Sequence, residues 1–217
     1  MWTVEQRHQY NAAYYRTHRA SEIQRVRSRQ RATLEFLRDL RRRPCSDCGQ
    51  TFPPWVMDFD HRDPCDKSFP HTTGRALLKS RAALMLEIAK CDVVCANCHA
   101  FRTYRQMQAR KNGLPPEMWA PGKSDYIEKK RERWRLNAQL LRDLCDVPCA
   151  DCGIRFPSFV MQFDHRDPTR KRFTVSRIIT RSREVIVEEV AKCDVVCANC
   201  HRIRTYSTRL KSRAGVA

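Results

Sequence analysis

Cysteine, histidine and aspartate recur in this chain in two matching sets. Residues 91–99 read Cys-Asp-Val-Val-Cys-Ala-Asn-Cys-His, and residues 193–201 repeat them letter for letter. Each copy is preceded by a Phe-Asp-His-Arg-Asp-Pro segment, at 59–64 or 163–168, and before that by a Cys-x2-Cys pair. Two such pairs can surround one tetrahedral Zn²⁺ with four thiolates. We therefore predict two structural zinc ions, one held by Cys45, Cys48, Cys95 and Cys98, the other by Cys149, Cys152, Cys197 and Cys200.

Disulfides and unreactive buried thiols are the alternatives to zinc. The tight Cys-x2-Cys spacing favours the metal and a reducing compartment. We therefore expect a cytoplasmic location, either with the nucleoid or in a phage-infected cell. Cys91 and Cys193 also repeat and could compete as ligands, but we interpret them as small core residues. A closed site of four thiolates has no open coordination position, so these zinc ions would be structural.

A second set of repeated residues is not needed for zinc, and its chemistry is different. It comprises an Asp-His pair and a later histidine, which occur as Asp60, His61 and His99 and as Asp164, His165 and His201. A carboxylate and an imidazole can hold a divalent ion, while a second imidazole can act as a general base on water. Hydrolysis of a phosphodiester uses both groups.

This order of motifs resembles the HNH endonucleases, the zinc-bearing branch of the ββα-metal (His-Me finger) nucleases. The resemblance covers about residues 44–104 and 148–206. It implies that His61 and His165 are the general bases, and that Asp60 with His99, and Asp164 with His201, bind a catalytic Mg²⁺ or Mn²⁺. It also implies cleavage that leaves 5′-phosphate and 3′-hydroxyl ends.

The chain departs from the family pattern at the middle Asn of the family name. That residue usually stands shortly before the second cysteine pair and braces the loop that carries the base. Here the region reads Lys90-Cys91-Asp92. Either Asp92 and Asp194 take the supporting role, or Asn97 and Asn199, inside the cysteine pairs, act similarly. For Asn97 a simple turn between two zinc ligands is the alternative.

The repeat also sets the domain organisation. Residues 44–64 and 148–168 are identical at 15 of 21 positions. We predict a basic helical extension at 1–19, modules at 20–106 and 124–208, a linker at 107–123 with Pro and Gly pairs, and a basic tail at 209–217. The expected class is α+β and helix-rich, with two tandem zinc-stabilised ββα-metal domains, each preceded by a basic helix.

Local patterns predict the elements of each module. We expect a helix over 3–43, with Ser21 and Gln24 as a capping box and Pro44 as the stop. Residues 56–60 favour a strand, 74–90 a helix, 93–94 a short strand, and 98 onward a second helix. The second module repeats this order, with helices at 125–144 and about 182–192. Adjacent strand residues face opposite ways, so Asp60 and His61 can serve one site only if the backbone leaves the strand there.

The charge of the chain indicates its partner. It carries 42 Lys and Arg against 24 Asp and Glu, a net charge of +18, which favours nucleic acid. A membrane partner is disfavoured because no apolar run approaches about 18 residues. We interpret Lys67, Lys171, Arg102 and Arg204 as phosphate contacts, with solvated charge as the alternative.

We therefore predict a metal-dependent endonuclease acting on double-stranded DNA. A monomer with two modules could cut both strands as an internal pseudo-dimer. A zinc-bearing DNA-binding protein without cleavage is the alternative, and a nuclease directed at RNA has the same chemistry.

Overall fold

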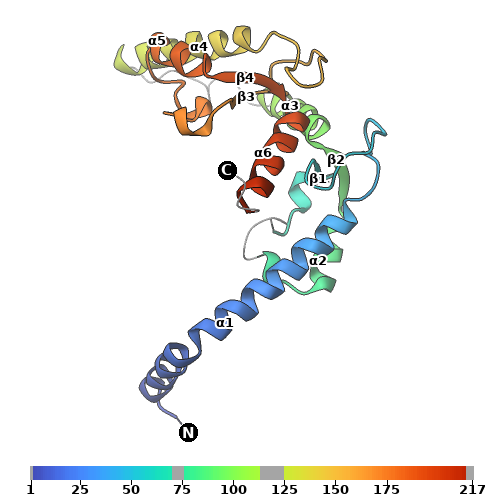
Figure 1. Cartoon of the computed structure of the whole chain (residues 1–217), viewed down its shortest axis with the longest axis vertical. Coiled ribbons are helices and arrows are strands. Elements are labelled where there is room, and N and C mark those ends of the chain that lie inside the picture. The colour runs from blue at the N-terminus through green and yellow to red at the C-terminus, as the bar shows by residue number, and fades with distance from the viewer. Residues whose placement is uncertain (1, 70–75, 113–124, 214–217) are drawn as a thin grey trace. The chain divides into compact units, whose positions relative to one another are not determined.

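The computed structural model describes residues 2–69, 76–112 and 125–213 of the chain (Figure 1). These residues form an α+β, helix-rich structure with two two-stranded sheets, as the sequence predicts. The chain separates into two compact units, Met1–Val93 and Val94–Ala217. The predicted linker begins inside a helix that continues to Asn112, and its residues 113–123 lie outside the described part.

The elements follow each other in the same order in the two halves of the chain. The first half contains α1 (Val4–Leu40), β1 (Met57–His61), η1 (Pro64–Asp66), η2 (Ala76–Leu78), α2 (Arg81–Ile88), β2 (Cys91–Cys95) and α3 (Ala96–Asn112). The second contains α4 (Asp125–Leu144), β3 (Met161–His165), η4 (Pro168–Arg170), η5 (Val175–Arg177), α5 (Arg183–Val190), β4 (Cys193–Cys197) and α6 (Ala198–Arg213). Within the described residues, no helix combines the length and apolar composition needed to cross a bilayer.

The capping box of α1 is at Thr3 and Gln6, so its prediction at Ser21 and Gln24 is wrong. The Gln6 backbone N–H donates to Thr3 Oγ1 at 3.2 Å, and the Thr3 N–H donates to Gln6 Oε1 at 3.0 Å. Ser21 lies inside the continuous helix, where its hydroxyl donates to the His18 carbonyl at 2.8 Å. A serine hydroxyl satisfied by a preceding carbonyl does not need to end the helix.

The first unit packs the C-terminal part of α1 against the short elements that follow the sheet. Thr33 and Leu37 are the buried residues of α1, and η2 lies against this helix. The predicted helix over 74–90 is divided: η2 ends at Leu78, and α2 begins after Ser80, whose Oγ accepts the Ala83 N–H at 3.2 Å. A serine cap satisfies a backbone donor that a continuing helix would have paired internally.

The second sheet is regular through both strands. β3 and β4 run antiparallel, with Met161 opposite Cys197, Phe163 opposite Val195 and His165 opposite Cys193. The strand therefore continues through the Asp164–His165 pair without a bulge. Because successive strand residues face opposite sides, Asp164 and His165 belong to different faces of the sheet.

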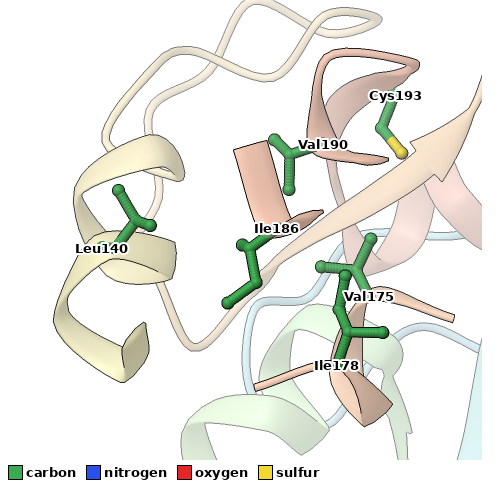
Figure 2. Close-up of a cluster of buried hydrophobic side chains, with 6 residues drawn as sticks. All are labelled: Leu140, Val175, Ile178, Ile186, Val190 and Cys193. Carbon is green, nitrogen blue, oxygen red and sulfur yellow. The ribbon is translucent and has the colours of Figure 1, made fainter. Parts of the chain in front are cut away.

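One face of this sheet covers the core of the second unit. Leu140 of α4, Val175 and Ile178 near η5, Ile186 and Val190 of α5, and Cys193 of β4 form one buried cluster (Figure 2). Asn137 of α4 holds the loop that precedes α5. Its Nδ2 donates to the carbonyls of Ile179 and Arg181 at 2.8 and 2.9 Å. α4 is therefore attached to α5 by apolar contacts and to the loop before α5 by hydrogen bonds.

Helix α3 also belongs to the second unit, where it packs on α6. At the start of these helices the Asn97 N–H donates to Asn199 Oδ1 at 3.0 Å, and the Asn199 N–H donates to Asn97 Oδ1 at 2.9 Å. Further along α3, the Tyr104 ring stacks on Phe159 with centroids 4.1 Å apart. Both asparagines are buried, so each side chain supplies the acceptor that the other helix terminus needs.

Replacing Ile186 by alanine tests this core assignment. Ile186 is fully buried, so Ile186→Ala should lower the free energy of unfolding by about 2–5 kcal/mol in urea denaturation of the zinc-loaded chain. Val187 is the matched control, because the same helix leaves it 44% exposed. Val187→Ala should cost less than about 1 kcal/mol. Equal losses from the two variants would contradict the assignment.

Candidate functional site

The eight cysteines of the Cys-x2-Cys pairs form two groups, as predicted. Cys45, Cys48, Cys95 and Cys98 form one group, and Cys149, Cys152, Cys197 and Cys200 form the other. In each group the four sulfur atoms lie within 4.8 Å of one another. Four thiolates at this separation suit a structural metal ion such as zinc.

Local backbone geometry brings the first pair of each group into position. Gly49 and Gly153 follow the second cysteine of the pair with φ of +70°, a conformation that glycine adopts without steric cost. The Gly153 N–H donates to the Cys149 carbonyl at 2.9 Å, and the neighbouring Ala150 N–H donates to Val195 of β4 at 2.9 Å. The turn is thereby tied to the strand that delivers Cys197.

Backbone donors surround Cys149 and favour its thiolate. Burial raises the pKa of Cys149, but N–H groups of Cys152, Cys197 and Asp151 outweigh burial and lower it to about 7. The Cys197 N–H lies 3.3 Å from the Cys149 sulfur. Metal binding by cysteine requires the thiolate, so these donors favour the metal-binding form of Cys149, whereas burial raises the pKa of Cys152 and Cys200.

The other repeated pair, Cys91 and Cys193, remains outside the metal groups. Cys193 belongs to the core cluster, and its thiol donates to the Glu189 carbonyl at 3.5 Å. Cys91 makes the equivalent contact with Glu87 at 3.5 Å. Burial raises the pKa of both thiols to about 11, so both stay neutral. Their interpretation as packing residues is confirmed for Cys193, while Cys91 is half-buried.

Asp164 and His201 meet on the α6 side of the second sheet. His201 follows Cys200 in the first turns of α6, and its Nε2 lies 3.5 Å from Asp164 Oδ1. This separation allows both atoms to bind one cation at about 2.1 Å. Asp164 offers a carboxylate oxygen, the ligand type that Mg²⁺ prefers, and His201 offers an imidazole nitrogen. The structure places Asp60 at the equivalent position of β1 and His99 in α3.

Arg204 connects Asp164 to two further carboxylates. Its guanidinium donates to Asp151 at 2.8 and 2.5 Å, to Asp194 at 2.9 Å and to Asp164 at 3.3 Å. Asp151 is the largest cause of the raised pKa of Arg204, and Arg204 in turn lowers the pKa of Asp194. Asp151 stands between Cys149 and Cys152, so Arg204 links the cysteine group to the Asp164–His201 pair.

His165 faces the opposite side of the sheet and meets a buried glutamate. Its Nε2 lies 2.8 Å from Glu189 Oε1, and in the first unit His61 Nε2 lies 2.9 Å from Glu87 Oε1. Glu87 and Glu189 are each only 1% exposed. The two halves of the chain therefore show the same His–Glu contact.

Each buried glutamate has a full set of donors. Glu189 Oε1 accepts the backbone N–H groups of Arg172 and Phe173 at 2.9 Å, and Oε2 accepts from Lys192 Nζ at 2.7 Å. Burial raises the pKa of Glu189, but Lys192, the Phe173 N–H, His165 and the Arg172 N–H together lower it to about 2. The same causes hold the pKa of Glu87 well below its usual range. Both carboxylates are therefore ionised.

The sequence motifs alone do not single out these two glutamates. A signal was present, because Glu87 and Lys90 recur as Glu189 and Lys192 at the offset of the adjacent cysteine motif. An acidic residue on a helix is usually solvated. The recurrence of Glu87 as Glu189 is therefore the only sequence feature that distinguishes these glutamates from other surface carboxylates.

The two candidates for the bracing role have different contacts. Asp194 Oδ1 accepts from Arg166 at 3.2 Å, and Arg166 also donates to the carbonyls of Cys193 and Ala191. Arg62 makes the same contacts with Asp92, Cys91 and Ala89 in the first unit. These arginines directly follow the Asp-His pairs, so Asp92 and Asp194 contact the segment that bears the histidine, and their bracing role stays a prediction. Asn97 and Asn199 instead join α3 to α6.

The predicted phosphate contacts lie in different surroundings. Lys67 and Lys171 are exposed at the ends of η1 and η4. Arg204 is engaged by three carboxylates, and its equivalent Arg102 lies in α3. Phosphate binding by these four residues stays a prediction, since the observed contacts of Arg204 give it a structural role.

An open groove borders Asp164 and His165 of the second unit, and His201 lines a separate pocket together with His165. The groove has a volume of about 670 Å³, and Asp164, His165, Arg166, Asp194 and Arg204 line it, with residues of α6 on the other side. Both members of the Asp-His pair therefore border one groove although their side chains contact different neighbours. No protein-family model, curated protein or solved structure matches this chain. Its function has to be argued from this geometry.

The cysteine groups predict a definite metal stoichiometry. Elemental analysis of the purified chain should find two zinc ions, and Cys149→Ser should reduce this to one, because three thiolates bind zinc less tightly than four. Cys65 is exposed and outside both groups, so Cys65→Ser should retain two. A Cys149→Ser chain that still held two ions would contradict the assignment.

Glu189 predicts an acid-sensitive contribution to stability. Its pKa is about 2 in the folded chain against an ordinary 4.5, so its ionisation stabilises the fold above pH 4.5 and loses this effect as pH falls toward 2. Glu189→Gln should therefore be less stable than the wild type at neutral pH, and the difference should shrink below pH 4.5. Urea denaturation at several pH values measures it. A difference that did not change with pH would show that the carboxylate charge contributes nothing.

Proposed function

We propose that this chain is a metal-dependent endonuclease of the HNH type. The observation that carries the proposal is the pairing of Asp164 and His201, 3.5 Å apart. His165 lines one groove with Asp164 and a second pocket with His201. A cation site of two residues beside a histidine is the minimum that phosphodiester hydrolysis needs. The same residues recur in the first half of the chain, so we propose two such sites.

In this proposal each residue has one role. His165 takes a proton from the attacking water, and the oxygen attacks phosphorus in line with the departing 3′ oxygen. Asp164 and His201 hold Mg²⁺ or Mn²⁺, which would offset negative charge on the phosphate and the leaving oxygen. His61, Asp60 and His99 have the corresponding roles in the first site. The products would be a 5′-phosphate and a 3′-hydroxyl.

The cysteine groups would bind zinc for stability and positioning. His201 directly follows Cys200, and Asp151 lies between Cys149 and Cys152. A metal held by these cysteines would fix the first turn of α6, which bears His201. It would also fix Asp151, which accepts hydrogen bonds from Arg204. We therefore propose two structural zinc ions, distinct from the catalytic ions.

The proposed substrate is double-stranded DNA. A net charge of +18 favours a polyanion, and exposed Lys67 and Lys171 lie shortly after the Asp-His pairs. Two sites in one chain would suit cleavage of both strands. Free cysteines and zinc are compatible with a reducing, cytoplasmic location.

A zinc-bearing DNA-binding protein without cleavage is the second candidate. The ion pair between Arg204 and Asp164 favours it, because a carboxylate already paired with a guanidinium need not bind a cation. Charge and cysteines are equally compatible with both functions. The recurrence of Asp-His beside a histidine of the metal-bearing helix favours the nuclease, since binding alone does not need it.

Supercoiled plasmid with the purified chain tests the proposal. With Mg²⁺ or Mn²⁺ we expect nicked or linear DNA, and none with EDTA. His61→Ala/His165→Ala should reduce the rate at least about 100-fold, because both general bases are lost. His8→Ala is the control, since His8 is exposed on α1, and it should cut normally.

The product pattern decides between the candidates. Linear DNA that forms early supports coordinated cutting of both strands, whereas nicked DNA alone shows independent sites or one active site. A plasmid that remains intact but shifts on a gel would favour the binding protein. If the purified chain, freed of bound RNA, cleaved an RNA substrate faster than DNA, RNA would replace DNA as the proposed substrate.

A further inference from the structure

We propose that Glu189 is a positioning residue, which fixes the nitrogen of His165 that accepts the proton from water. Glu87 would do the same for His61 in the first half of the chain. In this arrangement Nε2 of His165 keeps its hydrogen, which points to Glu189, and Nδ1 carries the lone pair that receives a proton from water. The inference deepens the proposed function and rests on it. It concerns a residue that the resemblance to HNH nucleases does not include.

The assignment of the tautomer follows from the donors around the carboxylate. Glu189 is ionised and almost completely buried, and an ionised carboxylate accepts hydrogen bonds but cannot donate one. His165 Nε2 lies 2.8 Å from Glu189 Oε1. At this distance the hydrogen must be on Nε2, so in the neutral ring Nδ1 is the unprotonated nitrogen.

The glutamate is itself held rigidly. Two backbone N–H groups, from Arg172 and Phe173, and the Lys192 ammonium bind its oxygens at 2.7–2.9 Å. In the first half, Ser68, Phe69 and Lys90 supply the equivalent donors to Glu87 at 2.8, 3.4 and 2.9 Å. A carboxylate fixed in this way can fix the ring that donates to it, as the aspartate of a Ser-His-Asp triad does.

The negative charge of the glutamate also has a consequence for the proton transfer. One O–H bond of water breaks, its proton passes to Nδ1, and the oxygen forms a bond to phosphorus while the bond to the 3′ oxygen breaks. The leaving oxygen takes a proton from solvent. His165 becomes an imidazolium, and Glu189 offsets its charge across the Nε2–H bond. A histidine that donated to a neutral acceptor would lack this stabilisation.

The tautomer can be measured without any cleavage. The full zinc-loaded chain, labelled with ¹⁵N-histidine, is studied by long-range ¹H–¹⁵N correlation at pH about 9, where the neutral ring of an ordinary histidine dominates. His61→Ala and His165→Ala variants assign the signals. We expect His165 and His61 to show a protonated Nε2 and an unprotonated Nδ1. A protonated Nδ1, or an exchanging mixture of the two forms, would overturn the proposal.

The role of the charge is tested in a chain with one working site. His61→Ala removes the first base, and Glu189→Gln is then added. Gln keeps an oxygen for the His165 and backbone donors but removes the charge. We expect kcat to fall about 10- to 100-fold with little change in KM, because a charged hydrogen-bond partner is lost as the imidazolium forms. Glu188→Gln, an exposed neighbour on α5, is the control and should leave kcat unchanged.

The outcomes separate this inference from the proposed function. Equal kcat in Glu189→Gln and Glu188→Gln, with zinc content and circular dichroism unchanged, would overturn the role of the carboxylate charge. If the Glu189→Gln chain failed to fold, the NMR measurement of the histidine tautomer in the wild type would test the positioning role. A wild type that never cuts DNA would overturn the proposed nuclease instead, and a protonated Nδ1 in an active wild type would overturn only the positioning role.

Discussion

Convergence of four cysteines is the constraint on which the rest of each site depends. In the second unit the sulfur atoms come from the turn before β3, the end of β4 and the first turn of α6. A metal bound there would join three elements that also meet in a small apolar cluster around Val160, Met161 and Val196. His201 follows one of these cysteines and Asp151 precedes another, so their positions depend on the same convergence.

The regular pleat of β3 gives two adjacent residues different chemical surroundings. Asp164 enters a network with His201, Arg204 and Asp194, at the edge of solvent. His165 turns to a buried, ionised Glu189. The strand does not need to bulge to bring both residues to one groove, because the groove passes over the strand end. Regular strand geometry therefore separates the proposed metal ligand from the proposed base, whose side chain is only 6% exposed.

The electrostatics of the two surroundings also differ. Arg204 is surrounded by three carboxylates, whose mutual repulsion it offsets. Glu189 is buried, but two backbone N–H groups and Lys192 outweigh the cost of burial and keep it charged. A buried carboxylate with this many donors is rigid, which is the property required of a group that orients a catalytic ring.

Residue type and spacing were sufficient to predict the two groups of four cysteines, the duplicated strand–helix order and the α+β class, because these features are encoded locally and appear twice. The sequence did not locate the α1 capping box or the start of α2, since several serines and threonines could serve as caps and packing chooses among them. Only the tertiary structure brought Glu189 to His165 and Arg204 to Asp151, residues 24 and 53 positions apart. It also directed Asn97 and Asn199 to each other rather than to the Asp-His loop. Such partners depend on how sheet and helices pack, which no local pattern of residues specifies.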